Sequence, residues 1–280
     1  MLSLPRSEIL AIAKLFKSPD EETKKLLEEQ LKKFDIKLLR GIYDEIGDLA
    51  IKGQFLELVG KLKREELKIK LSSWVKNNPQ DLQDGVFLVA SFGNPFFDFD
   101  YYSDLLDKWA LDLEKNLKKI KLKDDPTSII SEVNHFLFME LGFQGNKEGY
   151  YEAENSFIDK VIERKLGNPI LLSVIYILVS RLLGLPFSGV NMPSHFLVQY
   201  HDAFEPIFID PFNQGEIVTK ENCKERIKAL RLSWQEDYLS IPTNKQIVAR
   251  ILQNLANIYH NEDKFDLKDC IEDYIKVLKN

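Results

Sequence analysis

Apolar side chains recur at a helical period throughout the first part of the chain, residues 1–78. One apolar stripe follows Ser18 and consists of Leu26, Leu27, Leu31 and Phe34. Ser18 precedes Pro19 and can cap the predicted helix, whose first turn accommodates the proline. Residues 36–46 and 55–75 continue the same period with little strand signal. An all-helical region is therefore predicted here.

The boundary of this region is predicted at Asn77-Asn78-Pro79, because an Asn before a Pro ends one helix and caps the next. Helical periods resume at residues 82–91 and 102–117. A further helix is predicted over residues 126–141, and Gly142 is expected to end it.

The most apolar helix is predicted to begin at Asn168-Pro169, with Asn168 as its cap and Pro169 in its first turn. Gly184-Leu185-Pro186 ends it. A helix that is apolar on nearly every side must be surrounded by protein. This segment is therefore predicted to be the core helix of its domain.

Strand-like runs follow the core helix at residues 188–192, 195–201 and 204–209. If the last two form a hairpin closed symmetrically around Asp202-Ala203, His195 lies directly opposite Asp210. Directly opposed residues have Cβ atoms roughly 4.5–5.5 Å apart. A bulge would make the two residues diagonal neighbours. In either case they are predicted to lie within hydrogen-bonding reach.

Two helical segments are similar to repeat proteins. The stretch FKSPDEETKKLLEEQL looks like one HEAT-type unit, and residues 245–259 with 267–278 look like one tetratricopeptide unit. Because one unit cannot bury its own apolar face, the C-terminal helical hairpin is expected to dock on the core. The N-terminal helices are expected to form a packed cap, and a partner-binding surface is the alternative.

The composition excludes several classes of protein. A net charge of −6 and a pI near 5.4 argue against a general nucleic-acid surface. Cys223 and Cys270 form no CxxC pair, so no zinc or redox motif is present. The apolar run at residues 170–183 is too short to span a bilayer, and the N-terminus has no signal-peptide core. A cytoplasmic protein without a membrane association is therefore expected.

A His paired with an Asp can form the orienting half of a nucleophilic triad. The nucleophile would stand at the start of the core helix, where the helix field lowers a thiol pKa, but Pro169 occupies that position. Ser173 is the nearest hydroxyl and is expected to pack inside the helix. Cys223 follows Asp210 by about thirteen residues, with no evident route back to it. One His and one Asp fall short of a metal site, and no cofactor is expected.

Several motifs occur together and in one order between about Asn134 and Glu225. They are NHFLFMELGFQGN, YYEAENSFIDKVIERKLGNPILLSVIYILVSRLLGLP, GVNMPSHFLVQY and FIDPFNQGEIVTKENC. This segment resembles the transglutaminase-like proteins of the SirB type. The resemblance implies a papain-like, transglutaminase-type α+β core, in which a central buried helix packs on a small antiparallel sheet.

In active relatives of that wider superfamily, a Cys at the start of the core helix works with a strand His and a following Asp. The resemblance puts that Cys at or beside Pro169, and it matches His195 in PSHF and Asp210 in DPF to the other two members. Three residues within the family motifs are expected to line the same pocket, although each could equally cap a helix or bind a loop. They are Asn134, Asn155 and Asn168.

Three parts are therefore expected: a helical region at 1–78, a helix-rich α+β core at 79–241 and a docked helical hairpin at 242–280. The first functional hypothesis is a non-catalytic regulatory or protein-binding protein that engages a partner through the N-terminal helices. The second is a Cys-independent hydrolase or acyl-transfer enzyme that uses His195 as base and Asp210 as orienter. The third, compatible with the first, is a structural hydrogen bond between the same two residues.

Overall fold

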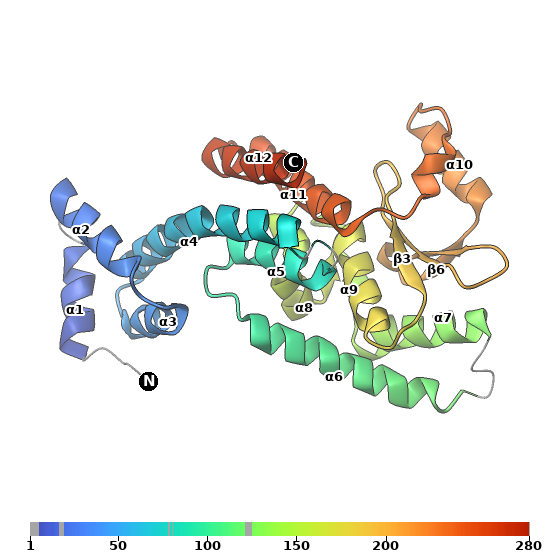
Figure 1. Cartoon of the computed structure of the whole chain (residues 1–280), viewed down its shortest axis with the longest axis horizontal. Coiled ribbons are helices and arrows are strands. Elements are labelled where there is room, and N and C mark those ends of the chain that lie inside the picture. Colours follow the sequence, from blue (N-terminus) through green and yellow to red (C-terminus); the bar gives the residue numbers. More distant parts are fainter. Residues whose placement is uncertain (1–5, 17–19, 78, 80, 121–124, 280) are drawn as a thin grey trace. The chain divides into compact units, whose positions relative to one another are not determined.

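The computed structural model of the chain describes residues 6–16, 20–77, 79, 81–120 and 125–279 (Figure 1). The chain divides into two compact units. One comprises Met1–Leu71 with Ser91–Phe97, and the other comprises Ser72–Ala90 with Asp98–Asn280. The boundaries expected near residues 78 and 241 remain predictions.

The first unit is helical, as predicted, and contains α1 (Arg6–Leu15), α2 (Glu21–Leu31), α3 (Ile36–Glu45) and most of α4 (Leu49–Asn77). Its core includes Leu27, Leu31, Ile42 and Phe55, whereas Leu26 is exposed. The Asp20 carboxylate caps α2, because it accepts hydrogen bonds from the backbone N–H groups of residues 22 and 23. The cap predicted at Ser18 lies outside the described residues.

The second unit surrounds its most apolar helix, α9 (Pro169–Arg181), and every side chain from Pro169 to Ser180 is buried. Tyr176 of this helix packs edge-on against Phe187 of the sheet, with ring centroids 5.1 Å apart. The prediction of a central core helix is confirmed. The other α-helices of the unit are the end of α4, α5 (Leu82–Gly93), α6 (Phe99–Leu117), α7 (Pro126–Asn134), α8 (Ile158–Arg164), α10 (Lys220–Ala229), α11 (Asn244–Asn261) and α12 (Phe265–Lys279).

Shorter segments join these helices. Residues His135–Glu140 continue α7 as a π-helical turn, and Gly142 then adopts the left-handed conformation at φ +77°. The segment Ala153–Ser156 is a 3₁₀ turn, and α8 ends at Lys165, whose φ is +61°. Gly167 belongs to β2 (Leu166–Gly167), which pairs in parallel with β1 (Gln144–Gly145).

The main sheet is antiparallel in the order β3 (Phe187–Val190), β4 (Leu197–Tyr200), β5 (Ile207–Asp210) and β6 (Glu216–Val218). Val198 lies opposite Ile209, whereas a hairpin closed around residues 202–203 would place it opposite Ile207. The predicted register of the two strands is therefore wrong by two residues. The connection is a six-residue loop, because Asp-Ala cannot readily adopt the backbone of a two-residue hairpin turn.

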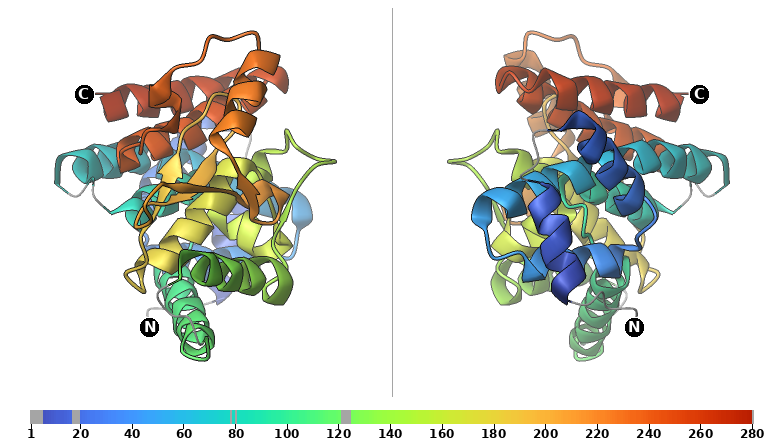
Figure 2. Two further views of the ribbon diagram at one scale, coloured as in Figure 1. Left: turned by 90° about the vertical axis from the view of Figure 1, so that its right-hand side faces the viewer. Right: turned by 90° about the vertical axis from the view of Figure 1, so that its left-hand side faces the viewer.

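The two faces of the main sheet pack against different helices. One face carries Phe187 and Tyr200, whose rings pack together 5.1 Å apart, and it lies against α9. The opposite face carries Phe208 and Val218, which form a second core with Cys223 and Ile227 of α10. Beyond the sheet, α11 and α12 form an antiparallel pair and lie side by side in Figure 2.

Candidate functional site

The structure brings His195 and Asp210 together. His195 lies two residues before β4 and Asp210 is the last residue of β5, so the two are diagonal neighbours. His195 Nε2 lies 2.9 Å from Asp210 Oδ2. The expected proximity is present although the expected register is not.

The carboxylate of Asp210 is completely buried and carries several partners on one oxygen. Oδ2 lies 2.9 Å from His195 Nε2, and it accepts hydrogen bonds from Arg226 Nη1 at 2.9 Å and Asn213 Nδ2 at 3.0 Å. Burial alone would raise the pKa of Asp210, but the contacts with His195, Asn213 and Arg226 outweigh it and lower the pKa to about 2. Oδ1 has no hydrogen-bond partner among the described residues. Asp210 is thus a fixed anion at neutral pH.

The imidazole of His195 is held mainly by packing. Nε2 is buried and close to Asp210, but its N–H is not aligned with Oδ2 as a hydrogen bond requires. The ring packs edge-on against Phe212, with centroids 6.3 Å apart. The side chain is 16% exposed, so the accessible part of the ring is the part away from Nε2. That edge could receive a proton from a bound molecule.

The start of α9 is fully occupied by hydrogen bonds of its own. Asn168 Oδ1 accepts from the backbone N–H of Leu171 at 2.9 Å, and Asn168 Nδ2 donates to Ser156 Oγ at 2.9 Å. Pro169 fills the first helical position, as predicted. Asn168 is therefore a helix cap that also fixes the preceding turn.

Ser173 connects the start of α9 to the residue after His195. Its buried hydroxyl donates to the backbone carbonyl of Pro169 at 2.8 Å and lies 3.4 Å from the carbonyl oxygen of Phe196. The core helix thus begins beside the His195 segment. A hydroxyl that is already bonded to the i−4 carbonyl is poorly available as a nucleophile.

Cys223 lies in the apolar core under the sheet and is not a substitute nucleophile. It packs with Val190, Leu197 and Phe208. Burial raises the pKa of the Cys223 thiol, which disfavours the reactive thiolate. The thiol is free, in the sense that it forms no disulfide.

Asn134 supports the turn that follows Asp210. Its Nδ2 donates to the Gly215 carbonyl at 2.9 Å, and the Gly215 N–H donates to the Asp210 carbonyl at 2.9 Å. Gly215 has φ +79°, and a Cβ built there would lie 2.3 Å from the Asn134 amide. Asn134 and Gly215 therefore form a close-fitting pair.

Asn155 holds the loop before α8 instead of opening into a cleft. It is completely buried, donates to the carbonyls of Gly149 and Tyr150, and accepts from Asn146 Nδ2 at 2.9 Å. The same loop reaches the site, because the Tyr150 ring packs edge-on against Phe212 at 5.7 Å. Asn155 thus contributes to the site through the loop that it orders.

Sequence reasoning missed Arg226, Asn213 and Phe212. Asn213 follows Asp210 by three residues, a spacing typical of a tight turn, and that signal was available. Arg226 lies on α10, which reaches Asp210 only because that helix folds over the sheet. No local pattern marks it.

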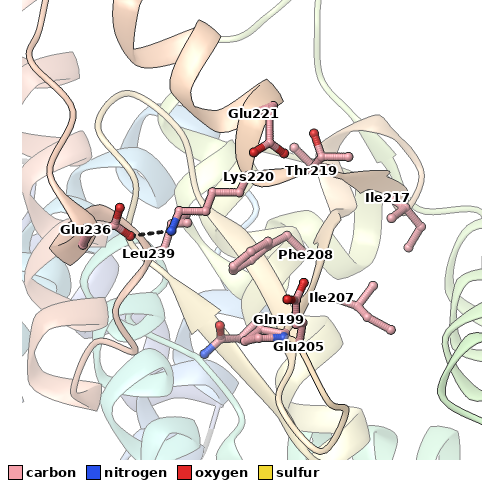
Figure 3. A pocket seen from close by; sticks show the side chains of 12 residues that line it. Gln199, Glu205, Ile207, Phe208, Ile217, Thr219, Lys220, Glu221, Glu236 and Leu239 are labelled. Carbon is pink, nitrogen blue, oxygen red and sulfur yellow. Dashed lines mark ion pairs between the residues drawn. The ribbon is translucent and has the colours of Figure 1, made fainter.

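The chemical capacity of the site is that of a buried His–Asp–Arg cluster. Among the described residues, no group of three or more His, Cys, Asp or Glu side chains could hold a metal ion. No described helix is both long enough and apolar enough to cross a membrane. A cavity of about 830 Å³ lies beside β5 and β6, but its lining contains neither His195 nor Asp210 (Figure 3).

Comparisons with known proteins bear on the fold of the chain. Residues 100–253 match the Transglutaminase-like superfamily, and this range contains the core helix and the whole main sheet. The chain is 34% identical over 206 residues to a UPF0162 protein of Xylella fastidiosa (strain Temecula1). The aligned segment covers 71% of this chain and 72% of that protein. A UPF0162 protein of Vibrio cholerae is 28% identical over 169 residues, covering 57% of this chain and 62% of the relative.

A third similarity involves a much longer protein. F-box only protein 21 of Mus musculus is 36% identical over 144 residues, which are 49% of this chain and 22% of that protein. No solved structure matches the chain.

Proposed function

The chain belongs to the transglutaminase-like superfamily, and from that premise we propose that it is a non-catalytic member that binds or regulates another protein. The observation that carries the proposal is the start of α9. The resemblance places the family thiol at or beside Pro169, which begins α9, and the nearby Ser173 hydroxyl is bonded to the Pro169 carbonyl. The free thiol of Cys223 lies in the apolar core with Val190 and Phe208.

Under this proposal, His195 and Asp210 are a structural pair. The Asp210 carboxylate joins three segments: the residues before β4, the turn after β5, and α10. An ionic cluster of this kind can fix the geometry of a turn without taking part in a reaction. The presence of His195 and Asp210 is then explained by their role in holding the fold together.

The partner in this proposal is a protein bound through the N-terminal helices. Large apolar side chains in this region are well exposed, among them Leu49 at 84% and Ile69 at 72%. These two side chains lie far apart on α4, so each offers a partner a separate apolar contact. The match to F-box only protein 21 supports a modular role, because there the similar segment is a small part of a longer chain. We place the protein in the cytoplasm.

The second candidate is an enzyme in which His195 activates water. The partial exposure of the His195 ring and the buried carboxylate behind it favour this candidate. The ring Nε2 faces Asp210, so the opposite nitrogen would act as the base.

One comparison separates the two candidates. Wild type and His195→Ala are assayed side by side for amide hydrolysis, ester hydrolysis and transamidation. The non-catalytic proposal expects equal, background-level turnover in both proteins. Turnover that depends on His195 would favour the water-activating enzyme.

A further inference from the structure

The cavity shown in Figure 3 is separate from the His195 cluster. It has a volume of about 830 Å³, within the range of pockets for drug-sized ligands or short peptides. Its walls come from Gln199 of β4, from the start of β5 and the loop before it, from β6, from the start of α10 and from the segment at residues 236–239. A pocket of this size beside an open sheet edge has room for an organic molecule.

The cavity has an apolar base. Phe208 and Val218 belong to the core under α10, and Leu239 packs against that core. Ile207 and Ile217 extend the apolar lining toward the sheet edge. The apolar part of a ligand would be removed from water here, which favours binding in proportion to the area buried.

Gln199 is an unpartnered polar group in this apolar lining. Its side chain is only 4% exposed and lines the cavity next to Phe208 and Glu205 (Figure 3). Its carboxamide forms no hydrogen bond with any described residue. Buried side-chain amides nearly always have hydrogen-bond partners. The Gln199 amide is therefore free to bind a polar group of a ligand.

The charges around the cavity are mainly negative. Lys220 Nζ lies 2.7 Å from Glu236 Oε2, so this ammonium group is neutralised by its neighbour. Glu205 and Glu221 also line the cavity and lie near enough to act on the Lys220 ammonium, so three carboxylates share this one cation. The remaining negative charge beside an apolar base complements a positive charge on an apolar body.

We propose that this cavity binds an organic cation, an ammonium or amidinium-type group attached to an apolar body, through Gln199, Glu205 and Glu221. The cation lies between the two carboxylates, and the Gln199 carbonyl accepts one of its hydrogen bonds. The apolar body lies on Phe208. This site is independent of the His195 cluster and of any activity there.

Isothermal titration of the full-length protein with three ligands of one shape tests the charge preference. The ligands are benzamidine, which is cationic at neutral pH, benzamide, which is neutral, and benzoate, which is anionic. Benzamidine is expected to bind at least about tenfold more tightly than benzamide, and benzoate is expected not to bind. Equal affinities for benzamidine and benzamide, or no saturable binding of benzamidine, would overturn the proposal.

Variants locate the binding. Glu221→Gln is expected to weaken benzamidine binding about fivefold, and Glu225→Gln, one turn further along α10 and outside the cavity, is expected to leave it unchanged. Gln199→Leu should also weaken binding, with circular dichroism as the check on folding. Equal affinities of Glu221→Gln and Glu225→Gln would contradict the site.

The natural source of the cation is distinguished by two further probes. One is an acetylated, amidated tripeptide with a central arginine between two leucines, and the other is agmatine. Tighter binding of the tripeptide would identify a basic peptide segment as the ligand, and tighter binding of agmatine would identify a small free amine. Failure of both to compete with benzamidine would contradict recognition of such cations.

Discussion

Arg226 and His195 contact the same oxygen of Asp210, with Nη1 and Nε2 each 2.9 Å from Oδ2. In a triad that works by proton transfer, the carboxylate serves to orient and stabilise the imidazole. Here a permanently charged guanidinium already stabilises the buried anion. This arrangement makes Asp210 first of all the centre of a structural ion cluster.

Replacement of Asp210 should therefore destabilise the fold. In Asp210→Asn the buried anion is lost, and Arg226 and His195 lose their shared partner. Removal of one member of a buried ionic cluster costs about 3 kcal/mol of unfolding free energy. Urea denaturation measures the loss, with the exposed Glu216→Gln on the paired position of β6 as control. A loss no greater than that of the control would contradict the structural role.

Acid should weaken the fold in a defined range of pH. Burial raises the pKa of Asp210, but the contacts with His195, Asn213 and Arg226 outweigh this effect and lower it to about 2. An unfolded Asp has a pKa of about 3.9. The stabilisation is thus complete above about pH 3.9 and disappears as the pH falls through about 2, with a size of order 2 kcal/mol.

The measurement is the unfolding free energy of wild type minus that of Asp210→Asn, followed from pH 5 to the lowest pH at which both fold. The difference should shrink with acid in this range. A difference that does not change with pH would mean that the Asp210 carboxylate is not responsible.

The close fit of Gly215 and Asn134 predicts a specific steric cost. Gly142→Ala and Gly215→Ala both place a side chain at positive φ, +77° and +79°, but nothing lies within 4 Å of a Cβ at Gly142. Gly142→Ala should cost about 1 kcal/mol. Gly215→Ala should cost about 2 kcal/mol more, because its Cβ meets the Asn134 amide.

A double-mutant cycle checks this explanation. Asn134→Ala removes the obstructing amide, so Gly215→Ala should be less costly in the Asn134→Ala background than in wild type. Thermal or urea unfolding of the four proteins gives the coupling energy. An equal cost in the two backgrounds would exclude the clash.

A thiol placed at the start of α9 should be reactive. Pro169→Cys in a Cys270→Ser background puts a thiol at the helix N-terminus, next to the segment that Ser173 joins to Phe196. The helix field and His195 favour its thiolate, so we expect the rate of its alkylation by iodoacetamide to rise with pH at a lower pH than that of an ordinary thiol, although burial of position 169 slows access of the reagent. Adding His195→Ala should slow the alkylation. If His195→Ala has no effect, the start of α9 does not face His195.

Much of this fold was predictable because its signals are local. The Asn168 cap, Pro169 in the first turn and the continuous apolar surface of α9 are all contained in one segment. The sheet register was not predictable from the sequence, because the loop of residues 201–206 contains no strong turn signal. The short β6 was also missed, since two of its three residues are exposed and do not alternate clearly.

The residues of the candidate site likewise divide into those with a local sequence signal and those without one. His195 and Asp210 could be paired from strand order alone, since the diagonal and direct positions both lie within reach. Arg226 could not be assigned, because its contact with Asp210 depends on how α10 packs over the sheet. Asn134 and Asn155 lie in family motifs, but their partners are backbone carbonyls of distant loops, which sequence patterns do not specify.

The most direct test of the central claim is turnover by the full-length wild-type protein. A broad panel of amide, ester and amine-acceptor substrates is assayed with wild type and with His195→Ala, at matched concentrations of folded protein. We predict that both give the same background rate, because the start of α9 carries Pro169 and a bonded Ser173 hydroxyl in place of a free thiol. Reproducible turnover by wild type that is lost in His195→Ala would contradict the claim that the protein is non-catalytic.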